Sequence, residues 1–249
     1  MSAASRVAVI ADVHGNLAAL QAVVEDIARR GAEIVINVGD HASGPLWPGE
    51  TVDLLMRQTW TQIAGNCDRQ IVAQAPSEHG ASDRFAFERL TAKQKEWLAA
   101  LPATATMLDD ICVFHGTPRD DASYLLETVV DGHVRLAHPL EIEMRLDGVT
   151  APVMVCGHSH VPRIVRVDAG LIVNPGSVGL PAYDHDEPAP HAMETGAPDA
   201  RYALLERSND CWMAELIAVP YDHGRAADQA QRNGRADWAG ALRTGFASG

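Results

Sequence analysis

The sequence predicts a single α/β domain in which two β-sheets pack against each other and helices cover their outer faces. Three observations support this fold class. The first part of the chain alternates short apolar runs with amphipathic helical patterns, which is typical of parallel strands. The later part contains paired apolar runs separated by turn residues, which predicts hairpins. The 249 residues are 47% apolar and 21% charged, as in ordinary globular proteins.

The N-terminal part begins with a strand, a helix and a second strand. Residues 6–11 (RVAVIA) form a short β-branched run that predicts the first strand. Asn16 can cap the helix that follows, whose apolar residues recur at spacings of three and four until Gly31, a typical C-terminal cap. Residues 33–38 (EIVINV) predict the next buried strand, so the sheet is expected to begin parallel. A loop, a short helix and a third strand are then expected over 39–48, 51–57 and 60–64.

Beyond residue 90 the pattern becomes richer in hairpins. Thr91 is expected to cap an amphipathic helix, and residues 153–156 predict another strand. Three hairpins are predicted, pairing 104–108 with 111–114, 164–167 with 171–173, and 202–206 with 212–219, the last around Ser208-Asn209-Asp210. The Pro-, Gly- and acid-rich segment 181–199 is expected to be a long loop, either solvated or a lid. We therefore expect one domain over residues 1–220, with 221–249 as a helical or flexible tail of the same domain.

Composition excludes several classes of protein. The net charge of −13 argues against a nucleic-acid duplex as partner, because duplex binders need Lys and Arg against phosphates. No apolar stretch approaches the ~20 residues of a membrane helix, so no membrane association is expected. The opening residues MSAAS run directly into the first strand without the pattern of a signal peptide, and the four cysteines form no C-x-x-C pair. We therefore expect a cytoplasmic protein.

Five short polar motifs each follow a strand-like run. They are Asp12-Val13-His14, Gly39-Asp40, Gly65-Asn66-Cys67-Asp68, His115-Gly116 and Gly157-His158-Ser159-His160. In α/β sheets, ligands bind beyond the carboxyl ends of strands, so these motifs are expected to meet at one edge. The neighbouring glycines would let the backbone turn sharply there. A lone motif of this kind is usually only a loop turn, but five in order form a specific signal.

The residue types in these motifs predict a pair of metal ions. Two carboxylates, one amide and four imidazoles are present: Asp12, Asp40, Asn66, His14, His115, His158 and His160. This mixed oxygen and nitrogen set suits Mn, Fe, Zn, Co or Ni, with Mn favoured, better than Mg or Ca. Seven side chains are too many for one catalytic ion, but they serve two ions if one carboxylate bridges. Asp12 and His14 are expected to point to the same side of an extended chain.

The ordered motifs D-x-H, G-D, G-N-x-D, H-G and G-H-x-H resemble those of the calcineurin-like metallophosphoesterase superfamily, most closely its small prokaryotic single-domain phosphodiesterase branch. The resemblance covers about residues 6–220. It implies a four-layer sandwich of two mixed β-sheets flanked by helices. By the same resemblance, three residues would hold the first ion, three the second, and Asp40 would bridge them. These sets are Asp12, His14 and His160 for the first ion, and Asn66, His115 and His158 for the second.

One position departs from the pattern of the superfamily. The motif Gly-Asn is followed there by a histidine that is often treated as a general acid, whereas this chain has Cys67. A thiol with a pKa of ~8.5 is a poorer proton donor than an imidazolium, so substrates with good leaving groups are expected. Asp68 is expected to be a cap or to support the ligands. His41 is a candidate for a role near the site, and Arg119 for either a phosphate contact or a surface salt bridge.

The resemblance implies metal-dependent hydrolysis of a small phosphate ester by a hydroxide shared between two ions. A phosphodiester is the first choice of substrate, and Asp40, Asn66 and Cys67 are the candidate catalytic residues. The alternative within the same class is a nucleotide or dinucleoside-polyphosphate hydrolase. The alternative of another class is a binding or scaffold protein on this fold that has lost catalysis. Because metal binding needs neutral imidazoles, metal affinity is expected to fall as the pH drops through ~6.5.

Overall fold

The computed structural model describes residues 6–209 and 211–247, so the opening MSAAS and the turn residue Asp210 lie outside the described chain. Within that range the chain forms fourteen strands and eight helices. No helix of the described part has the length and apolar character needed to cross a membrane. The strands are β1 Arg6–Ile10, β2 Ile34–Asn37, β3 Thr61–Gln62, β4 Thr104–Met107, β5 Ile111–Phe114, β6 Glu127–Val130, β7 His133–Leu136, β8 Val153–Val155, β9 Arg163–Val167, β10 Gly170–Asn174, β11 Ala182–His185, β12 His191–Glu194, β13 Ala200–Ser208 and β14 Cys211–Val219. The helices are α1 Leu17–Arg30, α2 Pro48–Met56, α3 Asn66–Ala73, α4 Ala81–Arg89, α5 Ala92–Ala99, α6 Pro139–Leu146, α7 His223–Arg232 and α8 Ala236–Thr244.

Two five-stranded mixed sheets form the centre of the molecule. The first has the order β14-β13-β1-β2-β3, and the second has the order β4-β5-β8-β10-β9. β1, β2 and β3 run parallel, as predicted, and so do β5, β8 and β10. The strands β13 and β14 of the first sheet, and the edge strands β4 and β9 of the second, are antiparallel to their neighbours. All three predicted hairpins are therefore confirmed over their described residues.

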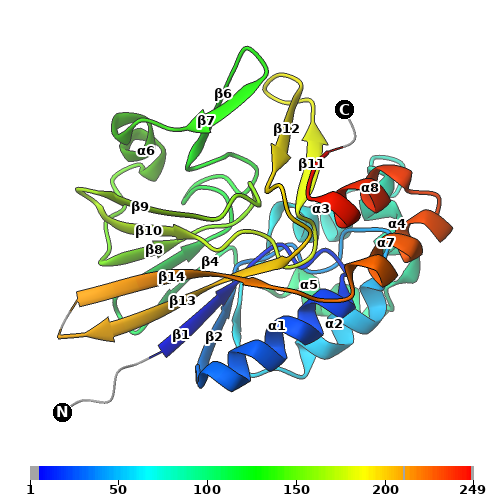
Figure 1. Cartoon of the computed structure of the whole chain (residues 1–249), viewed down its shortest axis with the longest axis horizontal. Helices are drawn as coiled ribbons and strands as arrows, with labels where there is room; N and C mark the ends of the chain where they lie inside the picture. Colours follow the sequence, from blue (N-terminus) through cyan, green and yellow to red (C-terminus); the bar gives the residue numbers. More distant parts are fainter. Residues whose placement is uncertain (1–5, 210, 248–249) are drawn as a thin grey trace.

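Side chains on opposite faces of the strands fill different cores, because successive residues of a strand alternate in direction. Val9 of β1 and Val113 of β5 belong to the core between the two sheets. Ile10, next to Val9, packs instead with Leu20 of α1 on the outer face of the first sheet. Helix α6 covers the outer face of the second sheet. The result is the four-layer α/β sandwich that the resemblance implies (Figure 1).

The first helix illustrates how local sequence sets its ends. The side chain of Asn16 accepts a hydrogen bond from the backbone amide of Ala19, which is the predicted N-cap. Gly31 adopts the left-handed conformation with φ of 70° at the other end, as predicted. Thr91 likewise caps α5, through a hydrogen bond from the amide of Gln94. These confirmed caps fix where the chain enters and leaves the helices around the site.

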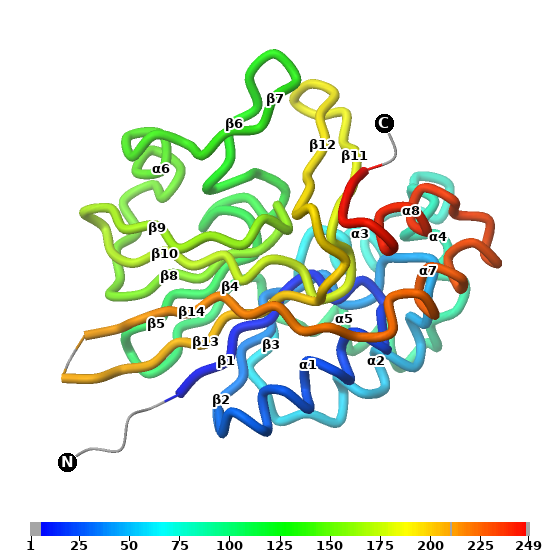
Figure 2. The backbone as a smooth tube through the Cα atoms, viewed as in Figure 1, coloured from blue at the N-terminus to red at the C-terminus, as the bar shows by residue number. Residues whose placement is uncertain are grey.

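One sequence prediction about the later part of the chain is wrong, because the segment 181–199 is not simply a long loop but contains the antiparallel hairpin β11–β12. The described part of the tail is helical, which is one of its two predicted states. Its helices α7 and α8 pack together and bury an alanine-rich face against Leu46 and Leu180. Figure 2 shows this tail running past α1 and ending beside β11.

Candidate metal centre

The seven predicted ligand residues converge from five separate segments. They lie in the loops after β1, β2, β5 and β8 and in the first turn of α3. All seven side chains belong to residues that are at most 9% exposed. The structure therefore brings together every residue of the predicted set, although these residues are up to 148 positions apart (160 − 12) in the chain.

Each of the four histidines is oriented by a backbone carbonyl group. Nδ1 of His14 lies 2.8 Å from the oxygen of Ser43, Nδ1 of His115 2.8 Å from that of Val38, and Nδ1 of His160 2.8 Å from that of Leu180. His158 uses the other nitrogen, with Nε2 at 2.9 Å from the oxygen of Ala122. Because a carbonyl oxygen only accepts hydrogen bonds, these nitrogens carry the protons. When such a ring is neutral, its other nitrogen is an acceptor, as metal ligation requires.

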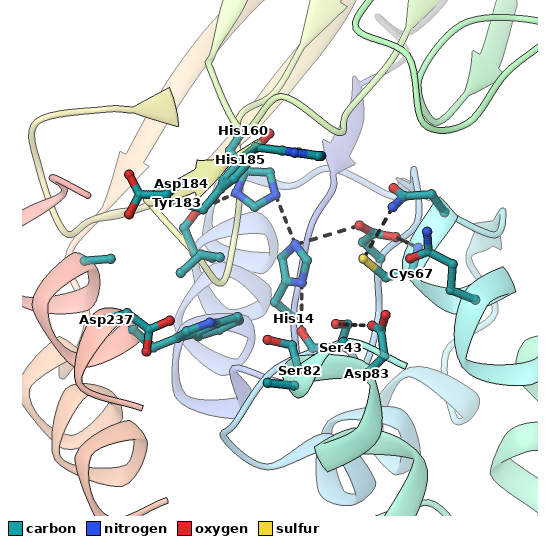
Figure 3. Close-up of a pocket in the computed structure, with 18 of the residues that line it drawn as sticks. His14, Ser43, Cys67, Ser82, Asp83, His160, Tyr183, Asp184, His185 and Asp237 are labelled. Atoms are coloured by element: carbon teal, nitrogen blue, oxygen red, sulfur yellow. Dashed lines mark hydrogen bonds and ion pairs between the residues drawn. The ribbon is translucent and has the colours of Figure 1, made fainter. Parts of the chain in front are cut away.

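Two of these acceptor nitrogens face each other. Nε2 of His14 lies 3.0 Å from Nε2 of His160, and the two rings tilt toward one another in Figure 3. Neither neutral ring has a proton to place between them, so their lone pairs oppose each other unless a cation lies beside both. Two nitrogens that each bind an ion at about 2.1 Å lie about 3 Å apart when their bonds meet at a right angle. The spacing thus fits two ligands of one ion.

The carboxylates lie beside these nitrogens. Asp12 Oδ1 is 3.5 Å from His160 Nε2, and Asp40 Oδ2 is 3.8 Å from His14 Nε2. His115 Nε2 lies 3.5 Å from the same Asp40 oxygen. The other oxygen of Asp12 is buried without a hydrogen-bond partner, which is costly for a carboxylate in the absence of a cation. Asp40 thus lies near both His14 and His115, in the position expected of a shared ligand.

Three groups of ligand atoms in the described chain lie close enough to hold a metal ion. Each group contains three atoms within 4.8 Å of one another. The groups are Asp12 with His14 and His160, Asp12 with Asp40 and His115, and His14 with Asp40 and Cys67. Asn66 adds an amide oxygen, since its Oδ1 is 3.1 Å from His115 Nε2. The residues present therefore fit divalent transition-metal ions, and both Asp12 and Asp40 belong to more than one group.

The backbone at the site is unusual. Asp12, His14, Asp40, His158 and His160 all have positive φ angles, from 50° to 67°. Each such non-glycine residue costs about 1–3 kcal/mol, and such residues cluster at functional sites. The prediction that Asp12 and His14 share a side because the chain is extended is therefore wrong in its mechanism. Left-handed backbone, rather than strand geometry, turns these side chains toward one another.

Burial and neighbouring charges set the protonation of the ligands. Burial lowers the pKa of His14 and, with the charge of His115, lowers the pKa of His158 to about 4. Burial acts in the same direction on His115, but the carboxylates of Asp40 and Asp12 outweigh it and raise the pKa of His115 to about 10. The pKa of Asp40 is held well below its usual value by His115, against the effect of burial. A proton on His115 thus neutralises part of the charge that a metal would neutralise.

Asp68 and His41 lie behind the ligands. The buried carboxylate of Asp68 accepts hydrogen bonds from the backbone amides of Asp40, His41 and Gly65. It also contacts Nδ1 of His41 at 2.7 Å. Asp68 is therefore the cap and supporting residue that the sequence predicts, and His41 is fully buried behind Asp40 rather than in the cavity lining.

Cys67 and Arg119 have different surroundings. The backbone amide of Cys67 donates to Asp40 Oδ1 at 2.9 Å, and its side chain lines the cavity beside the site. Burial and the charge of Asp40 raise the pKa of the thiol well above its ordinary value, so the thiol is protonated at neutral pH.

Arg119 pairs with Asp147 at 2.9 Å on the surface and is not in the cavity lining. The salt bridge, one of its two predicted arrangements, is the one observed.

A hydrogen-bonded chain outside the predicted motifs supports His158. Tyr183 of β11 donates to the backbone oxygen of His158 at 3.0 Å, and its ring meets that of His160 edge to face at 4.6 Å. Tyr124 lies 3.2 Å from the Tyr183 hydroxyl and stacks on the His158 ring at 5.0 Å. His191 of β12 completes the chain at 3.0 Å from Tyr124. The hairpin therefore packs onto the ligand loop, and no sequence motif pointed to these tyrosines.

The site opens into a cavity of about 1010 Å³. Asp40, Asn66 and His158 reach its lining. His14 and His160, which Figure 3 labels, do so as well. The cavity is strongly acidic. Seven carboxyl residues line it against one arginine: Asp40, Glu78, Asp83, Asp184, Asp186, Glu187, Asp237 and Arg235. The arginine itself pairs with Asp237 at 2.6 Å. Outside the ligand cluster, the walls therefore present mainly negative charge.

One family model matches the chain, and two solved structures share its fold. The family model of the calcineurin-like phosphoesterase superfamily domain matches residues 6–193. A metallophosphoesterase from Sphaerobacter thermophilus has a similar structure, with a TM-score of 0.76 and 24% identity over 97% of this chain and 99% of that one. A hypothetical protein from Pyrococcus horikoshii has a TM-score of 0.73 and 20% identity, covering 97% and 98%.

A curated relative also spans nearly the whole chain. An uncharacterized protein from Methanocaldococcus jannaschii is 23% identical, covering 95% of this chain and 96% of the relative. The matched family domain spans most of the chain and includes all five motifs of the cluster, from Asp12 to His160. The chain therefore belongs to the calcineurin-like phosphoesterase superfamily.

Proposed function

We propose that the protein is a phosphodiesterase that depends on two divalent metal ions, with Mn²⁺ favoured. The observation that carries this proposal is the pair of imidazole nitrogens of His14 and His160, 3.0 Å apart with both partner nitrogens bonded to carbonyl groups. Asp40 lies between this pair and His115, so its carboxylate can serve both ions. The mixed imidazole and carboxylate donor set favours Mn, Fe, Zn, Co or Ni.

Bound in this cluster, the two ions would polarise the phosphoryl group and lower the pKa of an attacking water molecule. The chain supplies the surroundings for that chemistry. Asp12, His14 and His160 would hold the first ion, and Asn66, His115 and His158 the second. The amide nitrogen of Asn66, which contacts only the weak acceptor Cys67 Sγ at 3.6 Å, would donate to a phosphoryl oxygen. Asp68 keeps Asp40 in place through the backbone amide of Asp40.

The charge of the cavity favours a diester over a polyphosphate. A phosphodiester carries one negative charge, whereas nucleotides and dinucleoside polyphosphates carry several. Beyond the ligand cluster, the described walls present the carboxyl groups of Glu78, Asp184, Asp186 and Glu187 with no unpaired lysine or arginine among the lining residues. Like charges at this spacing repel a polyanionic tail. The nucleotide hydrolase is therefore the second candidate.

Hydrolysis of bis(p-nitrophenyl) phosphate with added Mn²⁺ tests the proposal. Asp40→Ala removes the shared carboxylate and is expected to lower kcat/KM by about 100-fold or more, since even loss of a supporting partner costs 10–100-fold. Asp168→Ala, an exposed aspartate in the β9–β10 turn, is the matched control. Equal rates for wild type and Asp40→Ala would reject the mechanism and favour a non-catalytic binding protein. Faster hydrolysis of ATP or a dinucleoside tetraphosphate than of any diester would favour the second candidate.

A further inference from the structure

Cleavage of an unactivated phosphodiester needs a proton for the departing alcohol. An alkoxide is a strong base, and a positioned acid typically contributes 10²–10⁴-fold to such a step. Three groups of the cavity wall that could carry a proton do not suit this role. The pKa of Cys67 is raised well above the ordinary thiol value by burial, and the hydroxyl proton of Tyr183 is donated to the His158 backbone. Burial lowers the pKa of His185, so this ring is neutral at pH 7.

Asp83 is a carboxyl residue of the same cavity wall. It lies in the first turn of α4 and lines the same cavity as His14, Asp40 and Cys67. Its Oδ1 accepts a hydrogen bond of 2.6 Å from the hydroxyl group of Ser43, and no described residue bonds to Oδ2. The backbone oxygen of the same serine holds Nδ1 of His14. Ser43 therefore links the Asp83 carboxyl group to a metal-binding residue and leaves one carboxyl oxygen free in the cavity (Figure 3).

The surroundings of Asp83 favour its protonated form. Burial is the largest cause, and the negative charges of Asp40 and Asp68 act in the same direction. The Ser43 hydroxyl group and His79 act in the opposite direction. Together they raise the pKa of Asp83 to about 6 in the metal-free protein. The charge of Asp83 in turn contributes to the high pKa of Cys67, and both residues line the same cavity.

We propose that Asp83 is the catalytic acid that protonates the leaving alcohol of the phosphodiester, a role that rests on the proposed phosphodiesterase function. The bond between phosphorus and the leaving oxygen breaks, and its electron pair stays on that oxygen. This oxygen takes the proton of the Asp83 carboxyl group and departs as the alcohol. Water supplies the hydroxyl group of the new bond to phosphorus. The proton that this water loses returns to Asp83 through solvent, so atoms and charge balance.

A series of aryl methyl phosphodiesters tests this role in the Mn²⁺-loaded enzyme. Nitrophenolate is stable without a proton, whereas phenolate and alkoxides need one. Asp83→Asn is expected to lower kcat/KM about 100-fold or more for the phenyl ester, but less than about 3-fold for the p-nitrophenyl ester. Glu88→Gln, an exposed carboxyl residue of the same helix that does not line the cavity, is expected to change neither rate. An equal loss for both esters, or no loss for the phenyl ester, would overturn the role of Asp83.

The pH profile provides a second readout. Wild type is expected to show an alkaline decline in kcat/KM for the phenyl ester that Asp83→Asn lacks. Ser43→Ala removes the hydrogen bond that lowers the pKa of Asp83, so it should move this decline to higher pH. An infrared band of a protonated carboxyl group near pH 5 that is absent from Asp83→Asn would support the assignment independently of turnover.

If wild type cleaves neither ester, the proposed function itself fails. If wild type cleaves both esters and Asp83→Asn cleaves them at the same rates, only the role of Asp83 fails.

Discussion

The carboxylate of Asp68 holds the backbone amide of Asp40 at 2.9 Å, although the two residues are 28 positions apart. The same carboxylate also accepts from the amides of His41 and Gly65 and contacts the His41 ring. The backbone of Gly65 can lie close to the Asp40 carboxylate because glycine has no Cβ atom. A Cβ atom at this position would collide with that carboxylate. Asp68 thus fastens the loop after β2 to the start of α3, and this junction places the carboxylate that both ions would share.

Replacing Asp68 is expected to damage both stability and metal binding. Asp68→Ala leaves three buried amides and the His41 ring without their acceptor, so unfolding in urea should show a loss of about 3–5 kcal/mol. Asp68→Asn keeps the shape but loses charge, and it should lower Mn²⁺ affinity by about 10–100-fold in calorimetry. Glu25→Ala, on the exposed face of α1, is the control and should stay within about 0.5 kcal/mol of wild type. Unchanged metal affinity in Asp68→Asn would contradict this positioning role.

Metal binding is expected to release a proton from His115. The carboxylates of Asp40 and Asp12 overcome the effect of burial and raise the pKa of His115 from 6.5 to about 10, so the metal-free protein keeps this proton near neutral pH. This raised pKa contributes stability that is complete below about pH 6.5 and is lost as the pH rises through about 10. Because a histidine must give up its second ring proton to bind a metal, Mn²⁺ binding at about pH 8 should release about one proton. Calorimetry in buffers of different ionisation enthalpy measures that number, and a buffer-independent heat would contradict it.

The site was predictable because its signals are local. Each ligand follows a strand whose apolar run is visible in the sequence, and the topology of parallel strands then brings the loop ends together. The left-handed backbone of Asp12 and His14 was not predictable, because residues of these types adopt positive φ only where surrounding contacts enforce it. The backbone amide of His14 donates to Asp40 and that of Asp12 to Gly39, and both contacts join segments far apart in the chain.

The missed parts of the fold depend on long-range packing. The hairpin β11–β12 has proline, glycine and acidic residues nearby and no clear alternation, so its sequence resembles a loop. It is held by Tyr183 against His158 and Tyr124, contacts that no local pattern reveals. Helix α8 contains glycine and few large apolar residues, but its Trp238 fills a space beside Gly44 of the loop after β2. Sequence periodicity predicts a segment that buries one regular apolar face. The positions of β11–β12 and α8 depend instead on contacts with residues far away in the sequence.

Removing the hydroxyl group of Tyr183 is expected to weaken one metal ion more than the other. Tyr183→Phe keeps the ring against His160 but loses the hydrogen bond to the His158 backbone, so the ion held by His158 should lose about 10–100-fold in affinity. Titration with Mn²⁺ should then resolve two unequal sites. Tyr202→Phe is the matched control, because its hydroxyl group bonds Asp26 away from the site. Two sites weakened equally, or neither weakened, would contradict a selective effect on His158.

The C-terminal helices are expected to be essential to the stability of the centre. Trp238 is 6% exposed, and its ring meets that of His14 edge to face at 6.0 Å. Gly44 lies against the same indole, so a Cβ atom added there would come within 2.7 Å of it. Trp238→Ala should therefore lower the free energy of unfolding by about 3–5 kcal/mol, as for other buried aromatic residues.

Phe246→Ala provides the control for that variant, because Phe246 is 53% exposed and should contribute within about 0.5 kcal/mol. The Trp238 change should also lower Mn²⁺ affinity at the ion bound by His14, since it removes a contact that holds this ring. Urea unfolding measures the loss of stability, and metal titration measures the loss of Mn²⁺ affinity. In the unfolding experiment, Mn²⁺ at about 100 times its dissociation constant should restore about 2.7 kcal/mol per site. A Trp238→Ala protein as stable as Phe246→Ala would show that the tail is dispensable, and the packing of α8 against the His14 loop would then have no part in building the centre.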